Sequence, residues 1–179
     1  MSLFLAEYAV DPQDRAVIEA LGNDVAARAK QVGGELIEVQ VGTETKRAYI
    51  VLEHASQDVI ASALTDSAKP EAELAEVRLV GADLANVKAA RAGANFLVEW
   101  DLPSGLAMDA YLARKKANSP KYAEVPQVKF LRTYVREDMM KCLCFYDAPA
   151  EEDVRAARQA VGAPIDRLTH VSGAADGSA

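Results

Sequence analysis

The sequence predicts an α+β fold in which tandem ferredoxin-like βαββαβ repeats pack as a pseudo-dimeric α+β barrel. The chain repeats itself at an offset of about ninety residues, since FLAEY at 4–8 returns as FLVEW at 96–100 and YIVLEHA at 49–55 returns as CLCFYDA at 142–148. Strand and helix patterns follow one another in the same order in both halves. A βαββαβ unit leaves one face of its sheet without helices, so we expect the two sheets to cover each other.

The repeat also predicts the domain boundaries. Residues 1–82 form the first repeat, 83–94 a connector, 95–172 the second repeat, and 173–179 a tail of small residues. We expect this tail to be disordered. Each copy has roughly 80 to 90 residues, a size at which burial alone is marginal, which favours the packing of one copy on the other.

The first copy begins with a strand at residues 3–8, where side chains alternate in character. A helix follows Asp11 and Pro12 and ends at Gly33 and Gly34, with apolar side chains at helical spacing: Val17, Ile18, Leu21 and Val25.

Strands at 35–41 and 48–53 flank a turn-rich segment and predict a hairpin. A second helix has Ser56 as a plausible N-cap and Val59 among its inward residues. A strand at 72–80 closes the unit.

The second copy follows the same order. A strand at 95–101 precedes a helix around Met108, and two hairpin strands lie near 128–135 and 141–146. The last helix follows Pro149, carries acidic residues at 151–153 that favour its N-terminus, and ends at Gly162. A strand at 165–171 completes the unit.

Composition limits the classes of partner. The formal net charge is −7 and the basic residues are dispersed, so we expect no nucleic-acid partner. The sequence shows neither a long apolar run nor a signal segment, so we expect no membrane partner and a cytoplasmic location. Cys142 and Cys144 lie two residues apart in a predicted strand, at the limit of what a disulfide spans, and we expect reduced thiols.

The second copy resembles a family of small nickel-binding, ferredoxin-like proteins, mostly catalogued as a domain of unknown function, within the dimeric α+β barrel group. The resemblance lies in FLVEW at 96–100, KFLRTYV at 129–135, KCLCFYDAP at 141–149 and GAPIDRLTHV at 162–171. It implies nickel bound by several histidines on the first strand and both helices. This chain has only His54 and His170, and its first strands carry Glu7 and Glu99 instead.

Glu7 and Glu99 are the first candidate ligand-binding residues. Each lies on the strand face opposite the aromatic positions, so both are expected between the sheets, where desolvation would suit proton transfer or metal binding. The alternative, which we favour, is that each pairs with a cross-strand cation such as Arg132.

Arg132 and Tyr134 are the second pair of ligand-binding candidates, on a strand face that also includes Phe130. The corresponding face of the first copy carries Leu36, Glu38 and Gln40. The difference is expected if one copy holds a polar ligand and the other serves as its wall, and it is equally expected of neutral drift. His170, on the last strand, is the candidate metal ligand, and its alternative is a partly exposed strand histidine.

These features favour a non-catalytic binding protein that takes a small ligand or responds to a metal. The alternative is a cofactor-independent monooxygenase or isomerase, with Glu7 or Glu99 as proton acceptor and Arg132 or Tyr134 steadying a substrate oxygen. A cavity of several hundred Å³ between the sheets would permit the enzyme, whereas filling by Leu36, Val51, Phe130 and Tyr146 would exclude it. No sequence motif names a cofactor or a catalytic residue.

The duplication also bears on assembly. If the two sheets pair within one chain, the protein is a monomer with an internal pseudo-two-fold axis, or at most a weak homodimer. If the connector holds the copies apart, each open sheet would recruit another chain and form a stable homodimer.

Overall fold

The computed structural model describes residues 1–65, 67, 73–90 and 93–173. The N-terminal unit contains, in order, β1 (Ser2–Ala9), α1 (Arg15–Gln31), β2 (Glu35–Gly42), β3 (Arg47–His54), α2 (Gln57–Thr65) and β4 (Glu73–Val80). This is the expected βαββαβ order. Residue 72 of the predicted closing strand, residues 91–92 of the predicted connector and residues 174–179 of the predicted tail lie outside the described residues.

The C-terminal unit follows a short helix, α3 (Leu84–Ala90), that the sequence analysis did not predict. It contains β5 (Phe96–Asp101), α4 (Met108–Asn118), the 3-10 helix η1 (Ser119–Glu124), β6 (Lys129–Arg136), β7 (Lys141–Asp147), α5 (Glu151–Ala160) and β8 (Arg167–Gly173). The order is again βαββαβ, with η1 added after α4. Within the described residues, no helix is long and apolar enough to cross a membrane.

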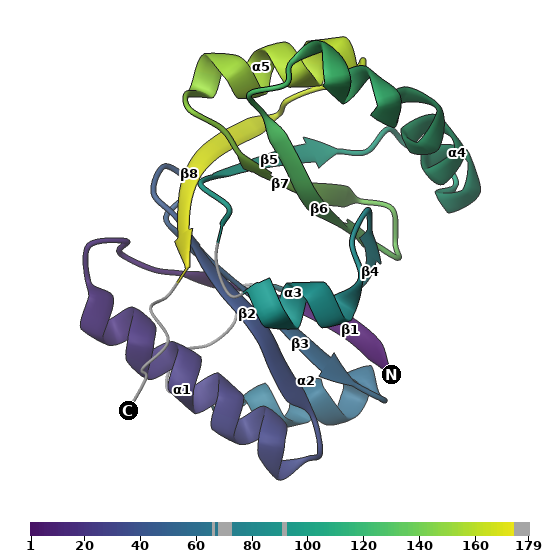
Figure 1. The fold of residues 1–179 in the computed structure, drawn as a ribbon. Coiled ribbons are helices and arrows are strands. Elements are labelled where there is room, and N and C mark those ends of the chain that lie inside the picture. The colour runs from purple at the N-terminus through teal and green to yellow at the C-terminus, as the bar shows by residue number, and fades with distance from the viewer. Residues whose placement is uncertain (66, 68–72, 91–92, 174–179) are drawn as a thin grey trace.

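The strands close into a single barrel in the order β1-β3-β2-β8-β5-β7-β6-β4, with antiparallel neighbours throughout. Two pairings join the units, β2 with β8 and β4 with β6. Figure 1 shows α1 and α2 on one side of the barrel and α4 and α5 on the opposite side. Closure leaves no strand of this barrel with an unpaired edge.

Three apolar clusters fill the molecule because strand side chains alternate between two faces. Phe4, Ala6 and Tyr8 of β1 pack under the N-terminal helices, and Phe96, Val98 and Trp100 of β5 pack under the C-terminal ones. The third cluster lies inside the barrel. It consists of the buried residues Leu5, Tyr49, Val51, Val77, Ala94, Leu97, Tyr134, Leu143, Phe145 and Val171.

Two β-bulges place some strand side chains on a different face of the sheet from the one predicted. The register shifts between Leu36 and Glu38 in β2, and between Phe130 and Arg132 in β6. A bulge inserts one residue, which turns the side chains before it to the other face. Leu36 and Phe130 therefore pack on the helix side, whereas Glu38 and Arg132 meet across the barrel.

The predicted equivalence of two strands is also wrong by one residue. The sequence match aligned Tyr49 with Cys142, but Tyr49 lies opposite Glu7 and Leu143 lies opposite Glu99. Tyr49 and Leu143 both face the barrel interior, whereas Cys142 faces the helices. Duplication of one unit stays a prediction.

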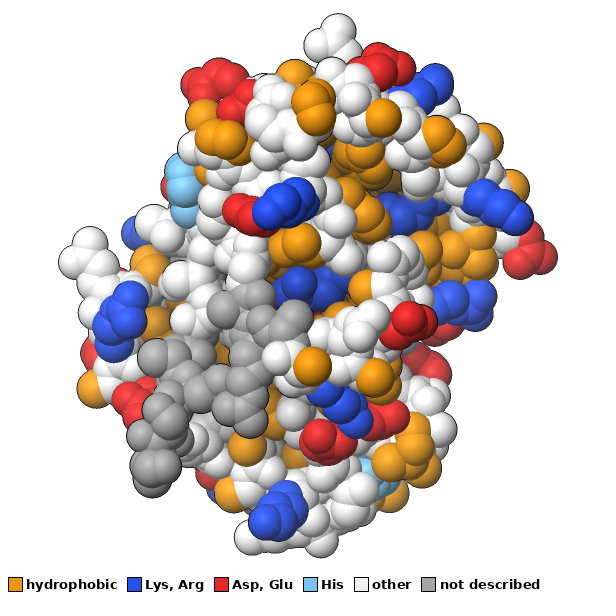
Figure 2. All heavy atoms as spheres, in the orientation of Figure 1, with side chains coloured by type: hydrophobic (Ala, Val, Ile, Leu, Met, Phe, Trp, Pro, Cys, Tyr) orange, Lys and Arg blue, Asp and Glu red, His pale blue; other side chains and the backbone are white. Residues whose placement is uncertain are grey.

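Two of the apolar residues that marked the predicted helices are partly exposed. Val17 is 45% exposed and Val59 is 41% exposed, because Ile18 of α1 and Ile60 of α2 already occupy the inner faces. Charged side chains of both signs are interspersed over the face in Figure 2, and the described part of that face has no continuous basic stripe.

Barrel closure predicts a monomer. Because β2, β4, β6 and β8 all find partners within the chain, no open sheet is left to recruit a second copy. Light scattering at micromolar concentration should give a mass near 19.2 kDa. A concentration-independent mass near twice that value would contradict the expectation.

Candidate functional site

One end of the barrel holds a buried ion cluster contributed by both units. Lys141 at the start of β7 places its Nζ 2.5 Å from Glu7 Oε1 and 3.1 Å from Glu99 Oε1. The side chains of Glu7, Glu99 and Lys141 are 1%, 3% and 10% exposed. Equivalent glutamates of β1 and β5 thus share one lysine inside the barrel.

Each glutamate also has an arginine of its own. The second oxygen of Glu7 accepts from Arg47 Nη1 at 2.8 Å, and the second oxygen of Glu99 accepts from Arg167 Nε at 2.7 Å. Removing such charges from water is costly unless they are paired and hydrogen-bonded. Both oxygens of each carboxylate are engaged by cations, which meets that condition.

Glu99 and Lys141 of this cluster line an open cavity of about 710 Å³, which we call the charged mouth, and Glu7 lies behind them as a partner of Lys141. Its walls carry charged side chains of both signs: Arg47, Glu73, Glu99, Asp101, Arg136, Lys141 and Arg167. This volume lies within the range of small-molecule sites, roughly 300 to 1,000 Å³.

Ion pairs order the walls of the charged mouth. Arg167 Nη1 donates to Asp101 at 2.9 Å, and this hydrogen bond lowers the pKa of Asp101, against the opposing effect of burial. Arg136 binds Glu73 and Asp138, and its hydrogen bond with Asp138 likewise lowers the pKa of that carboxyl. The cavity therefore presents fixed donors and acceptors.

Arg132 and Tyr134 lie at the opposite end of the barrel, apart from the two glutamates. Both donate to Glu38, with Arg132 Nε 2.8 Å from Glu38 Oε1, and Gln40 donates to the same carboxylate at 3.1 Å. Burial raises the pKa of Tyr134, and the charge of Glu38 adds to the effect. This cluster joins β6 to β2 across the barrel.

The four ligand-binding candidates therefore form two separate clusters. Arg132, named as a cation for Glu7 and Glu99, binds Glu38 instead. The interior apolar cluster lies between the two ends. Of the four residues whose filling of the space between the sheets would exclude the enzyme, Val51 lies there, whereas Leu36, Phe130 and Tyr146 pack on the helix sides.

Sequence reasoning missed Lys141, Arg47 and Arg167 as the cations of this site. Lys141 lies opposite Asp101, two residues before Leu143, which is the cross-strand partner of Glu99. Arg47 lies opposite Ala9, two residues before Tyr49, which is the cross-strand partner of Glu7. The available signal was a basic residue at the start of both β3 and β7. The sequence match, which aligns Tyr49 with Cys142 instead of Leu143, hides the equivalence of Arg47 and Lys141.

His170 lies away from both clusters, where it joins β8 to the β2–β3 turn. Its Nδ1 is 2.8 Å from Glu44 Oε1, and Glu44 also accepts from the Thr169 hydroxyl at 2.6 Å. Burial alone would raise the pKa of Glu44, but hydrogen bonds from Thr169 and His170 outweigh it and lower the pKa from 4.5 to about 2.

The described residues do not form a nickel site. No group of three or more His, Cys, Asp or Glu in that part of the chain could hold a metal ion. The imidazole of His54 is bound by the Val32 carbonyl at 3.0 Å and by Ser56. Cys142 and Cys144 are free thiols, as expected, and are buried with their sulfurs 4.0 Å apart.

Residues 96–171 match the family model described as nickel responsive protein SCO4226-like. The resemblance found in the sequence is therefore confirmed for the C-terminal unit. No curated protein matches the chain significantly.

Solved structures resemble the chain over nearly its whole length. A proposed chlorite dismutase, TA0507, has a TM-score of 0.51 at 6% identity, covering 97% of this chain and 95% of its own. A proposed monooxygenase from Lactobacillus acidophilus has a TM-score of 0.48 at 9% identity, and one from Fusobacterium nucleatum 0.44 at 10%, each covering 96% of this chain and 91% of its own. The likeness to TA0507 concerns the fold, a dimeric α+β barrel.

Replacing Lys141 by methionine should destabilise the protein by about 3–5 kcal/mol, because two buried carboxylates lose their shared cation. Chemical unfolding in urea measures the loss. Lys129→Met is the matched control, since Lys129 is 74% exposed and 3.7 Å from Asp147, and it should cost less than about 0.5 kcal/mol. Equal losses for the two variants would contradict the role of Lys141.

Glu44 should contribute to stability in a pH-dependent way. Its folded pKa of about 2 lies below the ordinary value of 4.5, so its contribution is present above pH 4.5 and is lost as the pH falls toward 2. The free-energy difference between wild type and Glu44→Gln should shrink over that window. A difference that stays constant from pH 6 to pH 2 would show that ionisation of Glu44 has no part in it.

Proposed function

We propose that this chain is a non-catalytic protein that binds a small polar molecule in the charged mouth. The observation that carries the proposal is the Glu7–Lys141–Glu99 cluster, of which Glu99 and Lys141 line a cavity of about 710 Å³. Burying three charges is a poor route to stability, because well-packed apolar side chains of similar volume often do as well or better. A recognition surface explains why they lie there.

The charge pattern favours a ligand with both donors and acceptors. Each cation of the mouth already has a carboxylate partner, so the cavity has no large excess of one sign to select a highly charged ligand. Arg47 and Arg167 remain 42% and 41% exposed, and Glu73 and Asp101 are 42% and 54% exposed. These four side chains can exchange water contacts for ligand contacts.

The same contacts support binding over catalysis. Glu7 and Glu99, the proposed proton acceptors of the enzymatic alternative, are each engaged by two cations. Arg132 and Tyr134, its proposed oxygen-binding pair, lie at the other end of the barrel. The cavity is large enough for a substrate, but the residues assigned to the reaction do not meet around it.

A nickel response is less well supported than small-ligand binding. The family match covers residues 96–171, but His170 has Glu44 as its neighbour and the described residues supply no third ligand. We further infer that the two units are tandem copies, since equivalent Glu7 and Glu99 share Lys141. The free thiols of Cys142 and Cys144 support a cytoplasmic location.

Thermal shift against a panel of small polar metabolites and Ni²⁺ tests the proposal. A ligand present at about 100 times its Kd should raise the Tm by roughly 5–10 °C. Arg167→Met should abolish the shift, whereas Arg155→Met should retain it, because Arg155 lies on α5 and pairs only with Glu151 among the ion pairs described.

Two results would overturn the proposal. One is the absence of any polar metabolite that shifts the Tm. The other is a shift caused by Ni²⁺ alone that survives Arg167→Met and is lost in His170→Ala, which would assign the response to a metal.

A further inference from the structure

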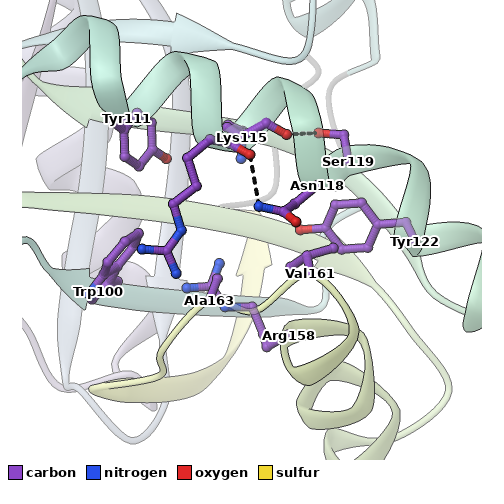
Figure 3. Close-up of a pocket in the computed structure, with 10 residues that line it drawn as sticks. Trp100, Tyr111, Lys115, Asn118, Ser119, Tyr122, Arg158, Val161 and Ala163 are labelled. Atoms are coloured by element: carbon purple, nitrogen blue, oxygen red, sulfur yellow. Dashed lines mark hydrogen bonds between the residues drawn. The ribbon is translucent and has the colours of Figure 1, made fainter.

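The C-terminal unit contains a second, smaller pocket on the helix side of its sheet. The pocket has a volume of about 40 Å³ and lies between α4, η1 and α5. Figure 3 shows Tyr111, Lys115, Tyr122 and Arg158 around one space, with Trp100 of β5 beside it. None of its lining residues lines the charged mouth, so the two sites are separate.

Every charged residue in the wall of this pocket is a cation, beside aromatic and apolar side chains. Arg114, Lys115 and Arg158 line it, and neither Asp nor Glu is among the lining residues. The ion pairs found in the described part of the chain include none of these three cations. This composition contrasts with the charged mouth, where each cation faces a carboxylate.

Arg158 is the decisive residue because it is buried with an unused donor. The residue is 3% exposed, and its Nε has no hydrogen-bond partner. Its other nitrogens reach Cys144 Sγ at 3.4 Å, the Tyr146 hydroxyl at 3.3 Å and the Pro164 carbonyl. A buried guanidinium without a carboxylate is costly unless an anion compensates it.

The neighbouring thiol compensates only part of this charge. A hydrogen bond from Cys142 lowers the pKa of Cys144, against the opposing effect of burial, and the charges of Lys115 and Arg158 add to the lowering. Even a fully ionised Cys144 would supply one negative charge beside three cations. Lys115 Nζ reaches it only through the Thr133 hydroxyl, with distances of 2.9 Å and 3.2 Å.

We propose that this pocket binds a small inorganic oxyanion, of the size of phosphate or sulfate. A volume of about 40 Å³ is several times the roughly 10–15 Å³ that a single water needs, which leaves room for a small polyatomic anion. Guanidinium and ammonium donors suit oxyanions through charge-assisted hydrogen bonds. The anion would supply the negative charge that the wall lacks.

Trp100 makes the binding directly measurable. It is the only tryptophan of the chain, it lines the pocket, and Arg114 lies over its ring at 5.5 Å. Titration with sodium phosphate or sodium sulfate, at ionic strength held constant with gluconate, should change its fluorescence saturably. Gluconate is too large for this volume. A response that merely follows ionic strength would overturn the proposal.

Matched lysine variants test the site itself. Lys115→Met should weaken anion binding about tenfold or more, because it removes a charged donor from the wall. Lys116→Met is the control, since Lys116 is the exposed neighbour on α4 and does not line the pocket. Equal affinities for the two variants would contradict the assignment.

A second variant and a second ligand complete the test. Arg158→Met, checked for folding by circular dichroism, should lose the fluorescence response, and a folded variant that keeps it would overturn the role of Arg158. Glycerol 3-phosphate should bind more weakly than inorganic phosphate. Equal or tighter binding would overturn the size limit and assign the pocket to the phosphoryl group of a larger molecule.

Discussion

The lysine shared by Glu7 and Glu99 is the interaction on which the rest of this structure depends. The two glutamates come from β1 and β5, and the barrel brings both within 3.1 Å of Lys141 Nζ. Such a cluster can persist in a barrel interior only if every charge finds a partner. The pairings β2–β8 and β4–β6, which close the barrel, therefore also place the ions that line one of its ends.

The buried charges at the two ends of the barrel are paired in different ways. At one end the cations surround an open cavity and keep part of their surface in water. At the other, Arg132 and Tyr134 converge on Glu38, and the Arg132 and Glu38 side chains are each 10% exposed. The first arrangement leaves polar groups for a ligand, whereas the second serves to hold β2 against β6.

Much of the fold could be predicted from the sequence, because strand alternation and helical spacing are local signals. The order of elements and the inward direction of Glu7 and Glu99 follow from periods of two and 3.6 residues. The bulges at Leu36 and Phe130 could not be predicted, since a bulge changes the face of the residues before it without changing composition. They place Leu36 and Phe130 on the opposite face from Glu38 and Arg132, with which the alternation groups them. Lys141 was missed for a related reason, since the register that sets its neighbours is a tertiary property.

The most direct test of the shared-lysine cluster compares Lys141→Met with the triple variant Glu7→Gln, Glu99→Gln, Lys141→Met by urea unfolding. Arg47 and Arg167 are 42% and 41% exposed and can be solvated when the carboxylates are neutralised. We expect the triple variant to recover about half or more of the stability lost in Lys141→Met, because it removes the buried charges left unpaired. A triple variant less stable than the single one would contradict the electrostatic origin of the cluster.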